Sequence, residues 1–284
     1  MNNKKTLLAY FGHHKCASTW IKSIIRPVCR ELNIKHAIAD DPGTFGGKLD
    51  LFCKENDIDF LSYLNADIRF VRDIKHYLGF HVIRDPRDIV VSAYFSHLHS
   101  HPTDNWPALV GHRKKLQGAS KDEGIFLEME FSKKEFEDLY NWDYSQANVL
   151  EFKMEDIIIE PYESMVKAFT YLKMVEEPMS LRRSFVFLLS KAINNVNGKN
   201  KGLFPFRISM NNMPVERLLM YIYRMRFSNK SKGRLRGQED VKNHYRKGVA
   251  GDWGNHFNQE HRRFFKDNYN DLLIKLGYEK SSNW

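Results

Sequence analysis

The chain has 284 residues, a length that suits one large α/β domain and excludes a peptide or a mini-protein. Hydrophobic residues make up 42% of it and aromatic residues 13%, enough to build a core, so disorder as the main state is excluded. The 44 Lys and Arg residues against 35 Asp and Glu residues give a formal net charge of +9. This excess calls for an anionic partner: nucleic acid, a membrane surface, or a ligand that carries phosphate or sulfate.

Apolar runs and cysteines bear on the compartment. Every apolar run is shorter than the roughly 18 residues that a membrane-spanning helix needs. Residues 1–5 are basic but precede no long apolar region that ends in small residues, so they do not resemble a secretory signal. The three cysteines, Cys16, Cys29 and Cys53, are too few for a disulfide framework and form no CxxC pair. We therefore expect a protein of the reducing cytoplasm without a transmembrane segment.

Strand and helix patterns alternate along the first half of the chain. The continuously apolar run 6–11 predicts a buried parallel strand, and the apolar residues of 21–32 recur at helical spacing. Pro27 lies inside that pattern and is expected to kink or shorten the helix. Further strands are predicted at 35–39, 68–71, 79–83 and 149–153. The alternation predicts an α/β fold of three layers, a central, mainly parallel sheet with helices on both faces.

The later elements are mainly helical. Asp85 followed by Pro86 is a helix-start signal, and further helices are predicted over 161–172, 215–222 and 265–276. Segment 178–237 has helical patterns but no clear strand. We interpret it as a mainly helical insertion within a single domain that spans 1–284.

The segment 12–20 predicts an anion-binding loop. It reads Gly-His-His-Lys-Cys-Ala-Ser-Thr-Trp and joins a strand to a helix, so backbone N–H groups and the positive helix end point at one place. Lys15 can reach an anion there, Ser18 and Thr19 can donate hydroxyl hydrogen bonds, and Trp20 can pack on a purine. Lys15 stands three residues before Ser18 with no second glycine, which departs from the Walker pattern of magnesium-dependent nucleotidases. The alternative is an ordinary connection with a solvated lysine.

Two further segments carry cations at positions where anions bind. Arg84 ends a predicted strand, which is where open α/β sheets bind ligands, and Ser92 lies two helical turns further on. Near the carboxyl terminus, Arg246 and Lys247 precede a glycine-containing loop that can fold closely around an anion. The alternatives are an Arg84–Asp88 ion pair and a solvated basic loop.

Together these segments resemble the sulfotransferase superfamily that uses 3′-phosphoadenosine 5′-phosphosulfate (PAPS). The run 15–20 matches the family loop PKSGTTW from its lysine onward, with Cys and Ala in place of Ser and Gly. Arg84 and Ser92 have the eight-residue spacing of the family's 3′-phosphate segment, and 246–257 fits RKGxxGDWxNxF. The resemblance implies a P-loop NTPase-like sulfotransferase fold. It also implies transfer of a sulfuryl group from PAPS to a hydroxyl or amine of an acceptor, without a metal ion.

The resemblance assigns roles to residues of this sequence. Lys15 corresponds to the lysine that contacts the departing phosphate, and is therefore a catalytic candidate. Ala17 stands where the family has Gly and adopts a positive φ less cheaply. The residues expected to bind the donor are Lys15, Cys16, Ala17, Ser18, Thr19, Trp20, Arg84, Ser92, Arg246, Lys247 and Gly248.

The general base has several candidates. Some family members have an acid at the end of the second strand, which favours Asp41 and then Asp40. Others have a histidine at the end of the strand before the 3′-phosphate segment, which adds Asp73 and His76. A turn or capping role is the alternative for each of them. The histidines of 97–112 include a possible metal pair, but a solvated or acceptor-site role is favoured.

Two other functions stay open beside that of a sulfotransferase. They are a P-loop-type kinase and a basic nucleic-acid-binding module; with a sulfotransferase, no nucleic-acid partner is expected. Segment 229–247 has seven Lys and Arg residues against two acids, which is consistent with a cover over the donor or with a separate binding surface. The acceptor class is a small molecule, a glycan or a lipid. No oligomeric state follows from the sequence.

Overall fold

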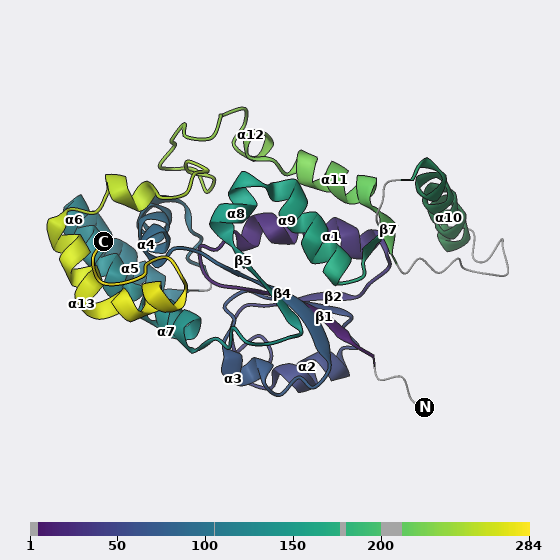
Figure 1. Ribbon diagram of the computed structural model, residues 1–284, viewed down its shortest axis with the longest axis horizontal. Helices are drawn as coiled ribbons and strands as arrows, with labels where there is room; N and C mark the ends of the chain where they lie inside the picture. Colours follow the sequence, from purple (N-terminus) through teal and green to yellow (C-terminus); the bar gives the residue numbers. More distant parts are fainter. Residues whose placement is uncertain (1–4, 105, 177–179, 200–211) are drawn as a thin grey trace.

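The computed structural model describes residues 5–104, 106–176, 180–199 and 212–284 (Figure 1). Its centre is a five-stranded sheet of order β2-β3-β1-β4-β5 in which every neighbouring pair is parallel. The strands are β1 (Leu7–Gly12), β2 (His36–Ala39), β3 (Phe60–Tyr63), β4 (Tyr77–Ile83) and β5 (Val149–Lys153). Because all five run in the same direction, their carboxyl ends meet at one edge of the sheet.

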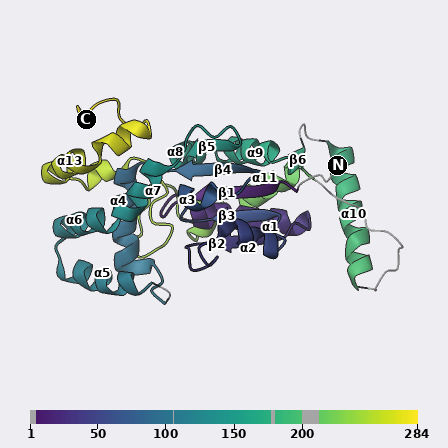
Figure 2. The same ribbon diagram turned by 90° about the horizontal axis from the view of Figure 1, so that it is seen from below.

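Helices cover both faces of the sheet, which confirms the predicted three layers (Figures 1 and 2). One face packs against α1 (Ser18–Glu31), α8 (Met154–Ile159), α9 (Pro161–Tyr171) and α11 (Val215–Arg224). The other face packs against α2 (Leu49–Glu55) and α3 (Ile68–Val71).

A helical region lies beyond the carboxyl edge of the sheet (Figure 1). It consists of α4 (Pro86–Phe95), α5 (Pro107–Gly118), α6 (Lys121–Phe131), α7 (Lys133–Asn141) and α13 (Gln259–Lys275), with the π-helix η1 (Ser96–Ser100) and the 3-10 helix η2 (Asp252–Asn255). Its own core includes Phe265 and Leu273, which are fully buried. Gly277 follows α13 with a φ of 69°, as expected for a residue that ends a helix.

The predicted insertion 178–237 lies partly outside the described residues, which omit 177–179 and 200–211. Its described part holds α10 (Leu181–Lys199), α11 and α12 (Phe227–Lys230), and α10 projects from one end of the molecule (Figure 2). It also holds one short strand that the sequence did not predict, β7 (Met213–Pro214), which pairs in parallel with β6 (Val175–Glu176). The α11 residue Leu218 is fully buried in the main core.

One local prediction is wrong, and one of the two effects expected of Pro27 is excluded. Residues 68–71 form the short helix α3, not a strand, because the carboxylate of Asp67 accepts from the backbone N–H of Arg69 and caps a helical turn. The strand before β4 is instead β3. Pro27 does not shorten its helix, since α1 continues to Glu31.

No helix among the described residues combines the length and the apolar character that crossing a membrane requires.

Candidate functional site

A large cavity lies at the carboxyl edge of the sheet. Its volume is about 1140 Å³, and each of the five strands of the sheet contributes a lining residue directly after its last residue. These residues are His13, Asp40, Leu64, Arg84 and Met154, which follow β1 to β5 in that order. Parallel α/β sheets bind ligands at this edge, where the connecting loops are free to vary.

The loop between β1 and α1 forms the centre of the cavity wall. Lys15 and Ala17 have φ angles of 62° and 61°, in the left-handed region that costs a non-glycine residue about 1–2 kcal/mol. A Cβ atom on Gly12 would lie 2.4 Å from the Tyr10 hydroxyl oxygen, so glycine is required there. Ala17 is the N-cap of α1 and provides no side-chain cap, which leaves the first N–H groups of the helix available to an anion.

The Lys15 side chain lines the cavity among other cations. Burial, followed by the charges of Arg84 and Arg246, lowers the pKa of Lys15 to about 7. An anion bound beside Lys15 would reverse both effects and favour the ammonium form. The surroundings of Lys15 therefore favour a ligand that carries negative charge.

Arg84 supports the loop rather than forming a close ion pair. Its Nη1 donates to the Lys15 carbonyl oxygen at 3.0 Å, whereas its Nη2 lies 3.9 Å from the Asp88 carboxylate. Ser92 lies further along α4 and lines the same cavity. The structure thus brings the first two sequence segments together.

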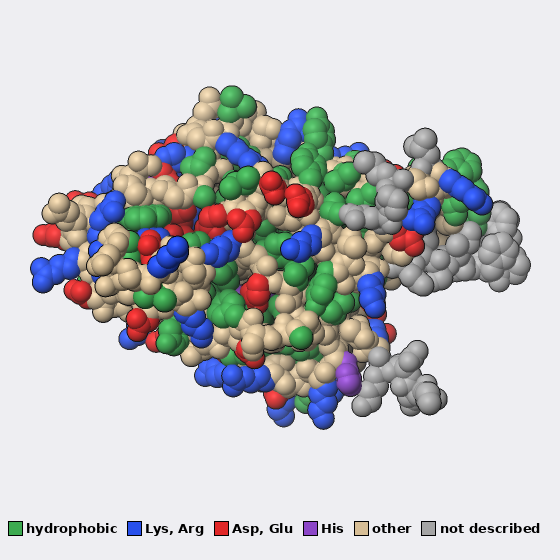
Figure 3. All heavy atoms as spheres, viewed as in Figure 1, with side chains coloured by type: hydrophobic (Ala, Val, Ile, Leu, Met, Phe, Trp, Pro, Cys, Tyr) green, Lys and Arg blue, Asp and Glu red, His purple; other side chains and the backbone are tan. Residues whose placement is uncertain are grey.

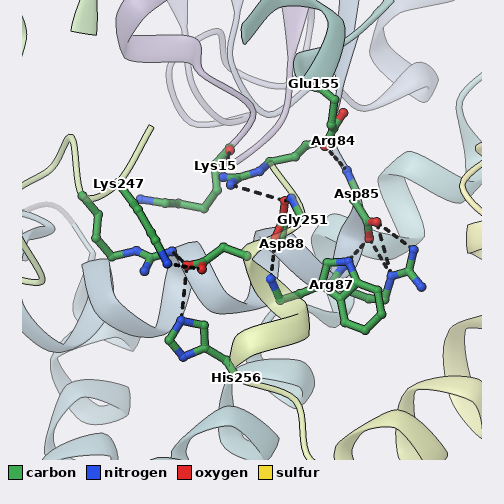
Figure 4. A network of polar contacts seen from close by, with 12 residues as sticks. Lys15, Arg84, Asp85, Arg87, Asp88, Glu155, Lys247, Gly251 and His256 are labelled. Atoms are coloured by element: carbon green, nitrogen blue, oxygen red, sulfur yellow. Dashed lines mark hydrogen bonds and ion pairs between the residues drawn. The ribbon is translucent and has the colours of Figure 1, made fainter. Parts of the chain in front are cut away.

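The third segment is attached to α4 through Asp88 (Figure 4). The buried Asp88 carboxylate accepts from the backbone N–H groups of Gly251 at 2.7 Å and Trp253 at 2.9 Å. A carboxylate that accepts two N–H groups fixes both the position and the orientation of the loop that carries them. As a result, Arg246, Lys247 and Gly248 line the cavity opposite Lys15.

Asp252 orients the two cations of that loop. Its carboxylate lies 2.6 Å from Arg246 Nη2 and 2.5 Å from Lys247 Nζ, and it also accepts from Asn255 and His256. Burial acts to raise the pKa of Asp252, but the hydrogen bonds from His256, Lys247, Asn255 and Arg246 prevail and hold it well below its usual range. Arg246 also pairs with Glu239.

Arg87 has a structural role that its place in the sequence did not indicate. Its guanidinium lies over the rings of Trp253 at 4.1 Å and Trp284 at 4.5 Å, measured to the ring centroids. It also pairs with the capping carboxylate of Asp85 at 2.8 Å and with Glu279 at 2.6 Å. These contacts tie the start of α4 to both η2 and the chain end, so they stabilise the cavity wall from behind.

The basic stretch 229–247 forms part of the cavity wall, together with residues just before it. Arg234 donates to the carbonyl oxygens of Gln238, Tyr245 and Arg246, which ties the two ends of the stretch together. Trp20 Nε1 donates to the Met225 carbonyl oxygen at 2.8 Å. The lining residues of this wall are Arg226, Phe227, Ser228, Arg234, Leu235, Arg236, His244, Tyr245, Arg246, Lys247, Gly248 and Val249.

The remaining donor-site candidates differ in access. Ala17, Ser18, Thr19 and Trp20 all line the cavity. The Ser18 hydroxyl already contacts the Tyr10 hydroxyl at 3.2 Å and the His13 carbonyl oxygen at 3.3 Å. Cys16 is fully buried in the core and is not among the lining residues. Because its side chain lies outside the cavity, only its backbone can serve a ligand, and burial also raises the pKa of its thiol.

The four candidates for the general base fall into two groups. Asp40 and Asp41 follow β2 and line the cavity, although the Asp41 carboxylate accepts from the backbone N–H groups of Gly43 and Thr44. Asp73 and His76 lie just before β4, at the opposite edge of the sheet, and neither lines the cavity. Naming them as base candidates was therefore wrong, since it rested on the strand wrongly predicted at 68–71.

Buried histidines form a chain of hydrogen bonds that the sequence did not predict. The fully buried Glu128 carboxylate accepts from His97 Nδ1 at 3.0 Å and from His112 Nε2 at 2.9 Å. His97 Nε2 lies 3.0 Å from Nε2 of His14, which lines the cavity beside Lys15. The favoured solvated role is therefore wrong for His97 and His112, which are buried.

A similar chain reaches the neighbouring residue of the same loop. The Glu151 carboxylate lies 2.6 Å from His81 Nδ1, and His81 Nε2 lies 2.8 Å from His13 Nε2. His13 also lines the cavity, but only 1% of its surface is exposed, whereas His14 is half-buried. The partners in both chains lie tens of residues apart, so no local pattern in the sequence indicates them.

Comparison with known proteins bears on the fold. No family model matches the chain, and no curated protein sequence matches it. Among solved structures, the chain is similar to a mouse sulfotransferase complexed with PAP, at 13% identity and a TM-score of 0.50, covering 96% of this chain and 86% of that one.

Two structures of retinol dehydratase are similar as well. One is in complex with androsterone and the inactive cofactor PAP, at 13% identity and a TM-score of 0.51. The other is in complex with retinol and PAP, at 12% identity and a TM-score of 0.50. Both alignments cover 96% of this chain and 82% of the other. With its parallel sheet, its helices on both faces and these matches over nearly its whole length, the chain is a sulfotransferase-fold domain.

Proposed function

We propose that this protein transfers a sulfuryl group from PAPS to a hydroxyl or amine of an acceptor. One observation carries the proposal: four cations from the three motif segments, Lys15, Arg84, Arg246 and Lys247, line one cavity at the carboxyl edge of the sheet. The similar structures hold PAP, which is PAPS without its sulfuryl group. A donor with phosphates at its 3′ and 5′ positions would bring negative charge to Lys15 and would add to the carboxylates that already pair with Arg246 and Lys247.

The proposed donor contacts follow from where each group lies. The N–H groups at the start of α1, with Ala17, Ser18 and Thr19, would bind the 5′-phosphate, and Cys16 would contribute only backbone. Trp20 would pack against the adenine. The residues that would bind the 3′-phosphate are Arg84, Ser92, Arg246, Lys247 and Gly248.

Lys15 would act on the leaving group. Sulfuryl transfer passes the group in line between two oxygen atoms, and the departing 5′-phosphate gains negative charge as its bond to sulfur breaks. An ammonium group and a helix N-terminus placed at that phosphate stabilise this charge. The bound donor would also raise the pKa of Lys15 from about 7, which keeps it protonated during the reaction.

For the acceptor we propose a small molecule with a hydroxyl group. Androsterone and retinol, which the structures of retinol dehydratase contain, are molecules of this kind. Glycan and lipid acceptors belong in the same screen of labelled PAPS against cell extracts. Asp41 and Asp40 line the cavity and are candidates for the base that accepts the hydroxyl proton. The proposed compartment is the cytoplasm, in line with three free, buried cysteines.

Two other activities have less support. A P-loop-type kinase would need the Walker arrangement, from which Lys15 departs. A nucleic-acid-binding module would need a continuous basic surface, but Lys and Arg side chains are interspersed with acidic and apolar ones on the face in Figure 3. We further propose that the activity needs no metal ion, which treatment with a chelator tests directly.

Calorimetry with PAP and ADP tests the donor site. Without magnesium, we expect PAP to bind at least about tenfold more tightly than ADP, because each charge-assisted hydrogen bond to the 3′-phosphate is worth roughly 1.5–3 kcal/mol. Arg246→Ala should remove most of this preference. The matched control is Arg263→Ala on α13, an arginine whose side chain is 88% exposed. Equal affinity for PAP and ADP, or binding that requires magnesium, would contradict the proposal.

A further inference from the structure

Beyond the donor site, we propose that His14 accepts the proton of the acceptor hydroxyl, and that Glu128 acts through His97 as a positioning residue that holds His14 in the required tautomer. This inference rests on the proposed function, because it assigns a role within that reaction. It starts from the hydrogen-bond chain Glu128–His97–His14, which links a buried carboxylate to the cavity.

The Glu128 carboxylate determines which ring nitrogen of His97 carries the proton. Burial acts to raise the pKa of Glu128, but the hydrogen bonds from His112 and His97 lower it, so the group is ionised and can only accept. His97 must therefore donate through Nδ1. Burial also lowers the pKa of His97, so the ring is neutral and its Nε2 carries a lone pair.

The second tautomer follows from the first. Since His97 Nε2 accepts, His14 Nε2 at 3.0 Å must donate. A neutral His14 ring then has its lone pair on Nδ1, and this atom makes no hydrogen bond with any described residue. The chain thus leaves an unoccupied proton acceptor on a residue that lines the cavity directly before Lys15.

The position of His14 is fixed by aromatic neighbours. Its ring lies edge to edge with that of His97, with the centroids 5.1 Å apart and the ring planes at 21°, and it contacts His101 at 5.3 Å and Trp106 at 5.4 Å. The π-helix η1 places His97 and His101 here, because the His101 N–H bonds to the Ser96 carbonyl oxygen five residues back. Single π-turns of this kind are frequent at functional sites.

The charges around His14 suit a base that works only with donor bound. Burial, followed by Lys15, His97, His101 and His244, lowers the pKa of His14 well below 6.5, so the free ring is neutral. These groups belong to the loop between β1 and α1, to η1 and the residue after it, and to the stretch 229–247, and none of them is anionic. The negative charges of a bound donor would raise the pKa of His14 toward the working pH, where a general base is most effective.

The proposed transfer forms one bond to sulfur and breaks another. The acceptor oxygen forms a bond to sulfur, and the bond between sulfur and the 5′-phosphate oxygen breaks with its electron pair on the phosphate. The hydroxyl proton moves to His14 Nδ1, which gives an imidazolium, and this proton then passes to solvent. Lys15 stabilises the departing phosphate in the same step. His14 touches the reacting hydroxyl, whereas His97 and Glu128 act through it.

Other groups in the cavity compete for this role. Asp41 is exposed and already accepts two backbone N–H groups. Glu135 on α7 lines the cavity, and burial raises its pKa to about 7. His13 ends a similar chain but is almost fully buried. Among the described residues that line the cavity, only His14 combines an acceptor atom without a hydrogen-bond partner and a place directly beside Lys15.

The first test measures tautomers in the unmodified protein. Long-range proton–nitrogen NMR spectra of histidine-labelled protein should show His97 protonated at Nδ1 and His14 protonated at Nε2. The opposite tautomer at His14 would overturn the proposal, whatever the activity of the protein. Glu128→Gln should disturb both tautomers, while Glu130→Gln, an exposed position on the same helix, should not. This readout needs neither donor nor acceptor.

The second test separates proton removal from binding. Labelled PAPS is used with p-nitrophenol, which ionises without help near neutral pH, and with p-cresol, which does not. His14→Gln should lower transfer to p-cresol by about 10²–10⁴-fold, should lower transfer to p-nitrophenol far less, and should remove the acidic limb of the pH profile. The matched control is His99→Gln, because His99 is exposed and does not line the cavity.

The outcomes distinguish the two proposals. Calorimetry should show PAP bound equally well by the wild type and by His14→Gln. If neither protein binds PAP, the proposed function fails while the tautomer result stands. If PAP binds but Glu135→Gln or Asp41→Asn removes the acidic limb and His14→Gln does not, the role assigned to His14 is wrong. Equal losses with p-cresol and p-nitrophenol would also overturn it, since they would indicate a purely structural effect.

Discussion

At the scale of single residues, the site concentrates unfavourable conformations and charges in the loop between β1 and α1. Lys15 combines a positive φ with a pKa lowered to about 7 by burial and by its cationic neighbours. Neither feature benefits the ligand-free protein. Strain and repulsion of this kind persist where the surrounding structure overcomes them, and they are common at functional sites.

Lys15→Met should therefore stabilise the ligand-free protein while abolishing turnover. In the unfolded chain Lys15 binds its proton up to pH 10.5, but in the folded protein only up to about pH 7, so folding releases a proton between these values. Stability consequently rises with pH across this window, and the methionine variant should lose that rise. We expect its Tm at pH 6 to increase by about 2–4 °C for each kcal/mol of repulsion removed. Scanning calorimetry at pH 6 and pH 9 would test this; an unchanged pH dependence would contradict it.

Single residues also mark what the sequence predicted and what it did not. From the sequence we noted that Ala17 stands where the family has Gly and adopts a positive φ less cheaply; in the structure its φ is 61°. The match could not indicate the histidine chains, because His97 and Glu128 lie on different helices and their contact depends on the packing of α6 against η1. Sequence patterns predict periodic elements and loop chemistry, whereas hydrogen bonds between distant segments depend on tertiary structure.

At the scale of elements, α4 joins the phosphate loop to the carboxyl-terminal loop. Its residue Asp88 binds the Gly251 and Trp253 backbone, and Arg84, just before it, binds the Lys15 carbonyl oxygen. For Asp88 the sequence left open an ion pair with Arg84. In the structure Asp85 alone caps α4, which frees Asp88 to hold the segment that resembles RKGxxGDW.

Asp88→Ala should release that segment. It leaves two backbone N–H groups unpaired at roughly 1–3 kcal/mol each, so we expect a loss of about 3 kcal/mol in the free energy of unfolding and weaker PAP binding. The matched control is Asp122→Ala, since Asp122 also stands in the first turn of a helix but is exposed. It should cost less than about 1 kcal/mol. Urea unfolding measures both; equal losses would argue against the role of Asp88.

Elements also show where sequence patterns fail. The run 68–71 is apolar and short, and such runs do not distinguish a strand from a buried helical turn. Here the Asp67 side chain caps a helical turn at 68–71, and the strand of this region is formed by Phe60–Tyr63 instead. Because of this error, Asp73 and His76 were expected at the carboxyl edge of the sheet, whereas they lie at the opposite edge.

At the scale of the whole molecule, part of the +9 charge has an assigned place. The basic stretch 229–247 and the three motif segments line one cavity, whereas other Lys and Arg residues are dispersed among acidic ones (Figure 3). Burial and the charges of Arg84 and Arg246 disfavour the ammonium form of Lys15, so a polyanionic ligand that binds there should stabilise the fold as a whole.

PAP at about 100 times its Kd should add about 2.7 kcal/mol to the free energy of unfolding and raise Tm by about 5–10 °C. The shift should shrink as salt is added, because screening weakens the charge interactions. Duplex DNA at the same phosphate concentration should have little effect. Thermal unfolding monitored by circular dichroism measures all three conditions. A large shift with DNA and none with PAP would favour the nucleic-acid-binding alternative.

The low pKa of Lys15 also makes its amine selectively reactive toward labelling reagents. An amine with a pKa near 7 is about half unprotonated in neutral buffer, whereas an ordinary lysine is unprotonated about a thousandfold less often. Acylating reagents react with the free amine, so brief labelling at neutral pH should modify Lys15 before the surface lysines. A nucleotide in the cavity would protect it. Mass spectrometry of the labelled peptide would then report occupancy of the cavity in crude extracts, before any acceptor is known.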